Sequence, residues 1–165
     1  MKFSLPNICS LLLCITVAAN AAADESSPAT TARKFVDALQ HQQFREAATM
    51  FARGPAQDSV ATEHILQRID ESLGSFATMH SIPSLPAGKS IKLEVPAHKT
   101  NVAKNQKFLQ FRYASTASDR HPVFYELNLT ADDTPPRVLS FGVHFPSSDA
   151  QLTARANQLI RLIYR

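Results

Sequence analysis

Six histidines are the residues of this chain whose type would suit a bound metal ion: His41, His64, His80, His98, His121 and His144. Imidazoles lie side by side when their spacing is i, i+4 on a helix or i, i+2 on a strand. The closest pair in this chain, His64 and His80, is separated by 80 − 64 = 16 positions. The spacing therefore predicts no metal site, and nothing else in the sequence indicates a cofactor.

Acid–base catalysis is the other chemistry that the residue types permit, since a carboxyl group in an apolar pocket beside a tyrosine hydroxyl can transfer a proton. The expected strands place Tyr113 and Tyr125 on their apolar face, but Glu94 and Glu126 on the opposite, polar face. Asp70, beside the apolar stripe of an expected helix, is the only helical acid to consider. We therefore predict no catalytic residue, and keep a small acid–base enzyme of the isomerase type as an alternative function.

Other function classes lack their sequence signatures. The chain has no G-x-S-x-G stretch for a hydrolase, and its four glycines form no phosphate-binding loop. Lysine and arginine number 17 against 14 acidic residues, and these charges are scattered along the chain. A nucleic-acid partner is therefore not expected.

The first 23 residues have the parts of a secretory signal peptide: a basic start at Lys2, an apolar run, and small residues at Ala21–Ala23. Pro6 and Asn20 shorten the apolar run below the roughly 20 residues that a permanent membrane span requires. We expect cleavage after Ala23 and a periplasmic or secreted protein without membrane association.

Both cysteines, Cys9 and Cys14, lie within this segment. Leu13 is bulky where a lipoprotein signal requires a small residue, so lipid attachment to Cys14 is not expected. A mature chain from Asp24 onward would have no disulfide and no thiolate ligand. Its stability would come from the apolar core of one domain, which suits its length.

Helical periodicity follows a polar, flexible lead-in at residues 24–30. Apolar residues recur at helical spacing over residues 31–51, with a break near Gln42-Gln43 that predicts two short helices or one bent helix. A further helix is expected from Thr62, a suitable N-cap, to Gly74, a suitable C-terminal stop.

After Gly74 the apolar period changes to two, which is typical of half-buried antiparallel strands. Four strands are expected, over residues 90–95, 107–113, 123–129 and 138–145, and a shorter fifth strand within 76–82. The side chains expected to face the core are Ile91, Leu93, Val95, Leu109, Phe111, Tyr113, Val123, Tyr125, Leu127, Leu129, Leu139, Phe141, Val143 and Phe145. Helices followed by a curved antiparallel sheet of 4–5 strands and a closing helix predict an α+β domain.

Three stretches, ARKFVDALQHQQFREAATMF, ILQRIDESLGSFATMHSI and VLSFGVHF, resemble secreted bacterial members of the nuclear transport factor 2-like superfamily. The resemblance covers residues 31–145, and residues 146–165 form an expected C-terminal helix extension that begins with Ser148 as a cap. It implies a cone in which N-terminal helices pack on a strongly bent sheet, often with a pocket between them. Because this superfamily includes enzymes, ligand carriers and interaction modules, the fold does not select a function.

The pocket of such a cone would be lined by Phe111, Tyr113, Tyr125 and Leu127, which we therefore expect to bind a ligand. Apolar walls with two tyrosine hydroxyls suit a small apolar molecule, a lipid-like group or a peptide. On the opposite sheet face, Phe108 and Phe124 predict a contact patch for a protein partner or a homodimer. Three functions are thus left open: a non-catalytic binding module, the acid–base enzyme, and a homodimeric assembly module with a filled core.

Overall fold

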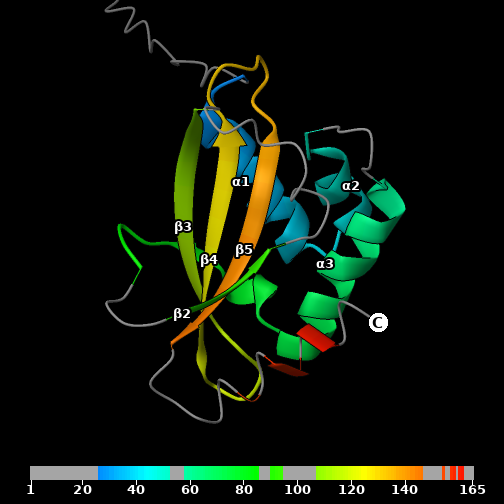
Figure 1. Cartoon of the computed structure of the whole chain (residues 1–165), viewed down its shortest axis with the longest axis vertical. Helices are drawn as coiled ribbons and strands as arrows, with labels where there is room; N and C mark the ends of the chain where they lie inside the picture. The colour runs from blue at the N-terminus through cyan, green and yellow to red at the C-terminus, as the bar shows by residue number, and fades with distance from the viewer. Residues whose placement is uncertain are drawn as a thin grey trace, which may run out of the picture.

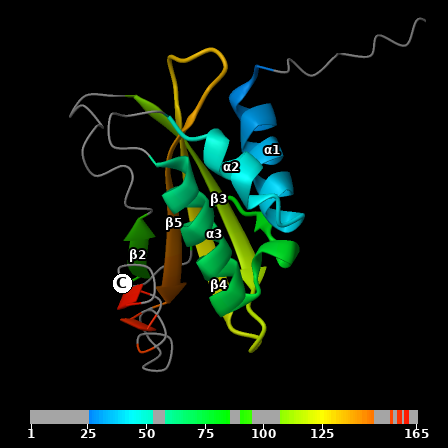
Figure 2. The ribbon, with the colours of Figure 1, turned by 90° about the vertical axis from the view of Figure 1, so that its right-hand side faces the viewer.

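Among the elements that the structure describes, three α-helices cover one face of an antiparallel sheet, and the other face of the sheet points away from them (Figures 1 and 2). The computed structural model describes residues 26–52, 58–85, 90–94 and 107–146, together with 154, 157–158 and 160–161. Its elements are α1 (Pro28–Gln40), α2 (Phe44–Thr49), α3 (Ser59–Leu73), the 3-10 helix η1 (Phe76–Thr78), β1 (His80–Ser81), β2 (Ser90–Glu94), β3 (Phe108–Thr116), β4 (Pro122–Thr130) and β5 (Val138–Pro146). The expected α+β class, with helices packed on an antiparallel sheet, is confirmed.

The start of α1 lies within the segment expected to be a flexible lead-in. Ser27 is its N-cap, because the Ser27 hydroxyl accepts a hydrogen bond from the Thr30 N–H at 3.2 Å. Pro28 follows in the first turn, where a backbone N–H has no carbonyl partner within the helix, so the N–H that proline lacks costs no hydrogen bond. These two residues start the helix three positions before Thr31.

The break expected at Gln42-Gln43 separates α1 from α2. The Gln43 N–H donates to the Ala38 carbonyl at 2.8 Å, and the Gln42 N–H donates to the Leu39 carbonyl at 3.1 Å. This pair of bonds is a Schellman motif, which requires a left-handed residue, and Gln42 has a φ of 58°. The chain turns here, and α2 begins at Phe44.

The N-cap of α3 is not the expected Thr62. The Asp58 carboxylate accepts a hydrogen bond from the Val60 N–H at 2.8 Å, and the helix begins at Ser59. Thr62 is buried, and its hydroxyl donates to the Asp58 carbonyl at 3.1 Å. The expected stop at Gly74 is confirmed, since Gly74 has a φ of 58° and its N–H donates to the Asp70 carbonyl.

The segment 76–82 forms less strand than expected. Residues 76–78 are the turn of η1, and only His80 and Ser81 pair with β3. Phe76 is fully buried and Met79 is 5% exposed. Because a helical turn points residues with i, i+3 spacing to the same side, η1 directs both side chains into the core, which a strand would not do.

The sheet order is β1-β3-β4-β5-β2, and all neighbours are antiparallel. The alternation expected for β4 is confirmed, because Val123, Tyr125, Leu127 and Leu129 are all fully buried. On β3, by contrast, Leu109 lies near the start of the strand and is 40% exposed. Leu109 lies opposite the fully buried Leu129 and so faces the core side as expected, but at the start of the strand it is not covered.

A bulge changes the facing of one residue on β5. The register shifts so that Leu129 pairs with Val138 and Asn128 pairs with Ser140. Val138 therefore takes the core position, and Leu139, which was expected there, is the extra residue of the bulge. Leu139 is 7% exposed but does not belong to the main core cluster.

The segment 1–25, with both cysteines, lies outside the described residues, as do His98 and Ser148. Of the expected closing helix, positions 154, 157–158 and 160–161 are described as helical. Ile160 packs against the core that the earlier elements form.

Candidate functional site

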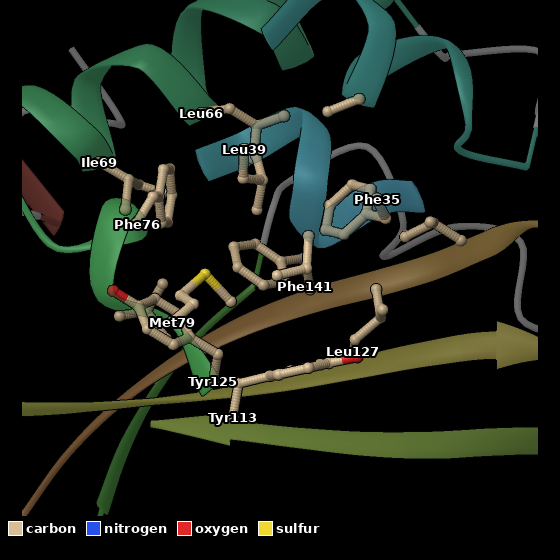
Figure 3. Packing of buried hydrophobic residues seen from close by; sticks show 14 of the residues in the cluster. Phe35, Leu39, Leu66, Ile69, Phe76, Met79, Tyr113, Tyr125, Leu127 and Phe141 are labelled. Carbon is tan, nitrogen blue, oxygen red and sulfur yellow. The ribbon is translucent and has the colours of Figure 1, made fainter. Parts of the chain in front are cut away.

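The residues predicted to line a ligand pocket lie at the centre of the hydrophobic core. Tyr125 and Leu127 are fully buried, Tyr113 is 7% exposed, and Phe111 is partly buried against the cluster. In the register of β3 and β4, Tyr113 lies opposite Tyr125 and Phe111 opposite Leu127. The sheet therefore brings the four residues together against the core cluster. Figure 3 shows three of them, Tyr113, Tyr125 and Leu127, on the sheet beneath side chains from the helices.

Aromatic rings occupy the space between the helices and the sheet. The Phe141 ring has its centroid 5.3 Å from that of Phe35, 6.0 Å from that of Phe76 and 5.5 Å from that of Tyr125. These are distances of direct ring contact. Leu39, Leu66 and Ile69 point into the same space from the helices (Figure 3). A ligand at this position would have to displace the protein's own side chains.

The hydroxyl of Tyr125, which a ligand would need as a polar anchor, is bonded within the core. It shares a short hydrogen bond with the Ser75 hydroxyl, and the Ser115 hydroxyl donates to it at 3.2 Å. Burial raises the pKa of Tyr125 to about 12. Burial, with a further contribution from the Asp37 carboxylate, raises the pKa of Tyr113 to about 12 as well. Both tyrosines are therefore neutral near pH 7.

No carboxylate lies among the buried side chains of the part of the chain that the structure describes. Asp70, the helical acid considered for acid–base chemistry, is partly buried on α3. One of its oxygens accepts from the Phe76 N–H at 3.4 Å and the other from the Gln42 side-chain amide at 3.3 Å. Asp70 thus links α3 to η1 and to the turn between α1 and α2, and the described core holds no acid positioned for catalysis.

The two aromatic residues predicted to form an interface lie at opposite ends of the outer sheet face. Phe108 pairs with Thr130, whereas Phe124 pairs with Ala114. Phe108 and Ala114, the partner of Phe124, are 114 − 108 = 6 residues apart along β3. At the rise of a strand this separation is about 20 Å. Phe108 is 52% exposed and Phe124 is partly buried.

A chain of hydrogen-bonded polar side chains runs between these two aromatic residues. The Gln110 amide donates to Asn128 at 3.2 Å, and Arg112 donates to Gln110. The Asn128 amide donates to Glu126 at 3.1 Å and to Ser140 at 2.9 Å. On the outer face the two aromatic residues are therefore separated by a row of polar side chains. A homodimer through this face stays a prediction.

A surface pocket that the sequence did not indicate is lined by residues of α1, of the end of α2 and of the loop that joins β4 to β5. The ribbon shows the start of α1 near this loop (Figures 1 and 2). We call this pocket the α1–loop pocket; it encloses about 300 Å³ and is lined by Thr31, Lys34, Thr49, Met50, Pro135, Pro136 and Arg137. Two of these residues are cationic, two carry hydroxyls, and none is acidic. The remaining three provide an apolar wall.

The loop side of the pocket is held by two hydrogen bonds between Thr130 and Arg137, which extend the β4–β5 hairpin. The Thr130 N–H donates to the Arg137 carbonyl at 2.9 Å, and the Arg137 N–H donates to the Thr130 hydroxyl at 2.9 Å. Thr130 is 1% exposed, so this connection is fixed in the interior. The peptide bond between Thr134 and Pro135 is cis. The two hydrogen bonds between Thr130 and Arg137 position the backbone of Arg137 at the rim of the pocket.

The α2 side of the pocket is joined to the start of β5. The Val138 N–H donates to the Met50 carbonyl at 2.9 Å, and the Ala52 N–H donates to the Val138 carbonyl at 2.8 Å. Phe51, between them, forms a parallel bridge with Val138 and is fully buried. These bonds hold the end of α2, with Thr49 and Met50, against the strand that follows the loop.

Sequence reasoning missed this pocket because its residues are distant along the chain. Thr31 and Lys34 have i, i+3 spacing and share a helix face. Arg137, however, is 137 − 34 = 103 positions from Lys34, within a stretch that reads only as a turn. The pairing of the loop with α1 is a property of the fold, and no local pattern would have found it.

The described residues hold neither a metal-binding cluster nor a membrane-spanning helix. No group of three or more histidine, cysteine, aspartate or glutamate side chains is placed to hold a metal ion there. In the same part of the chain, no helix has the length and apolar character needed to cross a membrane.

Comparison with known proteins found no matching family model, no matching curated protein and no matching solved structure.

Proposed function

We propose that this is a non-catalytic binding protein that takes a small ligand into the α1–loop pocket. The proposal is supported by the contrast between the space under the helices and the α1–loop pocket. The space between the helices and the sheet is occupied by fully buried rings such as Phe76 and Phe141, whereas the α1–loop pocket is open. Concave sites that combine an apolar wall with a few polar groups are the usual form of a ligand site.

The size of the pocket limits the ligand. Its volume of about 300 Å³ lies at the lower end of the range for small-molecule sites, roughly 300–1,000 Å³. A monosaccharide-sized or amino-acid-sized molecule fits this volume, and a folded domain or a long acyl chain does not. The proposed ligand is therefore a small molecule.

We also propose that the fold is a nuclear transport factor 2-like cone and that residues 1–23 are a signal peptide removed on export. The order of the elements, helices first and an antiparallel sheet after them, supports the first proposal. The basic start and the small residues at 21–23 support the second. An intact-mass measurement on exported protein tests the export proposal, and a mass that still includes Cys14 would refute it.

A homodimeric assembly module is the second candidate, and the exposed start of β3 favours it. Phe108 is 52% exposed and its neighbour Leu109 is 40% exposed. A second copy of this chain is the proposed occupant of that strand end. Sedimentation of the protein and of Phe108→Ser tests it: a dimer that dissociates in the variant supports assembly, and a monomeric parent protein refutes it.

The binding proposal is tested by nuclear magnetic resonance with a mixture of acidic, basic and neutral fragments. Thr49→Trp fills the pocket from an exposed lining position, and Gln67→Trp, at an exposed position on α3, is the matched control. We expect a subset of fragments to bind the parent protein and Gln67→Trp but not Thr49→Trp. Equal binding to all three proteins would show that the pocket is not the site.

A further inference from the structure

We infer that the ligand of the α1–loop pocket is a small organic carboxylate. Its carboxylate group is held between Lys34 and Arg137, and its apolar part lies against Met50 and the two prolines. This inference rests on the proposed function, since it names the chemistry of the molecule that the pocket takes. Three properties of the lining residues lead to it.

The first property is uncompensated positive charge. Lys34 and Arg137 both line the pocket and are exposed, and the lining contains no acidic residue. Within the described residues neither cation takes part in an ion pair. Two cations that face one cavity without an internal counter-charge raise the local concentration of anions there.

The second property is an excess of free hydrogen-bond donors. Thr31 lines the pocket and is 6% exposed. Within the described part of the chain, its hydroxyl makes no hydrogen bond. The Thr49 hydroxyl instead donates its proton to the Glu46 carbonyl at 2.7 Å. The donors left for a ligand are the Thr31 hydroxyl, the Lys34 ammonium and the Arg137 guanidinium. A group that only accepts hydrogen bonds, such as an ionised oxyanion, matches this set.

The third property is the apolar wall, which separates a carboxylate from a phosphate. Pro136 is buried, and Met50 is partly buried against the core cluster. An inorganic phosphate would leave this wall uncovered, whereas an organic carboxylate covers it with its hydrocarbon part. The planar guanidinium of Arg137 also matches a carboxylate through two parallel hydrogen bonds. The lining thus fits a molecule with one anionic end and one apolar end.

The test compares three probes by chemical-shift titration at constant ionic strength: benzoate, its neutral counterpart benzamide, and inorganic phosphate. We expect benzoate to bind most tightly, with affinity that falls as chloride is raised because added salt screens exposed charges. Benzamide that binds as tightly as benzoate would overturn the carboxylate inference. So would phosphate that binds more tightly than benzoate, or the absence of any binding by benzoate.

Variants that remove one charge each test which side chains hold the benzoate carboxylate. Lys34→Gln and Arg137→Gln should each weaken benzoate binding about tenfold, the amount expected for one charge-assisted hydrogen bond. Arg33→Gln and Lys107→Gln are the matched controls, since both positions are exposed and outside the lining. Thr31→Val replaces the hydroxyl by a methyl group and should weaken binding about threefold or more. Thermal melting confirms that the variant folds. Equal loss in the controls would mean a general charge effect and would overturn the assigned site.

The outcomes for the inference and for the proposed function are distinct. If a neutral or basic fragment binds the parent protein and is lost in Thr49→Trp, while benzoate does not bind, the pocket is a ligand site and the carboxylate inference is wrong. If benzoate binds equally well to Thr49→Trp, the proposed site itself is wrong.

Discussion

Tyr125 on β4 and Phe141 on β5 stack in an offset parallel arrangement at the centre of the core, with ring centroids 5.5 Å apart and ring planes 4° from parallel. They are diagonal neighbours, because Tyr125 pairs with Val143 and Leu127 pairs with Phe141. The stack lies where a cone-shaped fold would place a ligand cavity. It explains why the four residues Phe111, Tyr113, Tyr125 and Leu127 lie together without enclosing a site that is open to solvent.

Phe141→Ala should destabilise the protein by about 3–5 kcal/mol, because it removes a fully buried ring and leaves a cavity among other rings. Urea denaturation measures this loss. The control is Phe108→Ala on the outer face, where the ring is 52% exposed and the expected change is within about 0.5 kcal/mol. A similar small change for Phe141→Ala would contradict the packing of the core.

Much of the fold could be predicted from local pattern, because burial on one sheet face imposes a period of two. On β4 the fully buried series Val123, Tyr125, Leu127 and Leu129 follows this rule, and the contrast between the two faces is lost only at the end of the strand, where Asn128 and Thr130 are buried too. The rule fails where a β-bulge adds one residue to a strand and so reverses which residues face the core. The bulge at Leu139 moves Val138 into the core, and no side-chain pattern distinguishes these two adjacent apolar residues.

Helix ends were harder to predict, because several residues nearby have the chemistry of a cap. Asp58 and Thr62 both precede an apolar stripe, and only the backbone decides that Asp58 caps α3. Gln42 adopts the left-handed conformation at the end of α1, where glycine or asparagine is the usual residue. The α1–loop pocket was unpredictable for a related reason, since it depends on how a loop meets a helix start more than 100 residues earlier in the chain.

Tyr125 should make stability depend on alkaline pH. Burial raises its pKa from 10.0 to about 12, so the unfolded chain loses this proton at lower pH than the folded chain. The unfolded state therefore binds fewer protons between pH 10 and 12, and the free energy of unfolding falls by up to about 1.4 kcal/mol per pH unit from this group. Tyr125→Phe lacks the effect, and the stability gap between it and the parent protein should narrow as pH rises above 10. A gap that stays constant from pH 8 to pH 11 would argue against the raised pKa.

Gly74→Ala should destabilise the protein by about 1–2 kcal/mol, because Gly74 has a φ of 58° and alanine disfavours this left-handed conformation. An added Cβ would also lie 3.2 Å from the Ser118 Cβ, a tight contact. Gly74→Asn introduces the same contact but tolerates the left-handed conformation better, so it should cost less. Thermal unfolding of both variants measures the difference, and equal losses would mean that the contact with Ser118, not the backbone, limits this position.

Leu127→Trp separates the core from the α1–loop pocket as the place where a ligand binds. Leu127 is fully buried and does not line the pocket. The larger side chain should overpack the core and lower the free energy of unfolding by about 1–3 kcal/mol, while benzoate affinity stays unchanged in the folded fraction.

Thr49→Trp should show the opposite behaviour, because Thr49 is exposed at the end of α2 and lines the pocket. Its stability should change by only about 0.5 kcal/mol, and benzoate binding should be lost. Denaturation and titration on the two variants give four measurements that distinguish the sites. If Leu127→Trp folds and loses the ligand while Thr49→Trp keeps it, the ligand lies among Phe111, Tyr113, Tyr125 and Leu127. The stacked rings of Tyr125 and Phe141 would then have to separate on binding, which would appear as a large shift of their ring resonances.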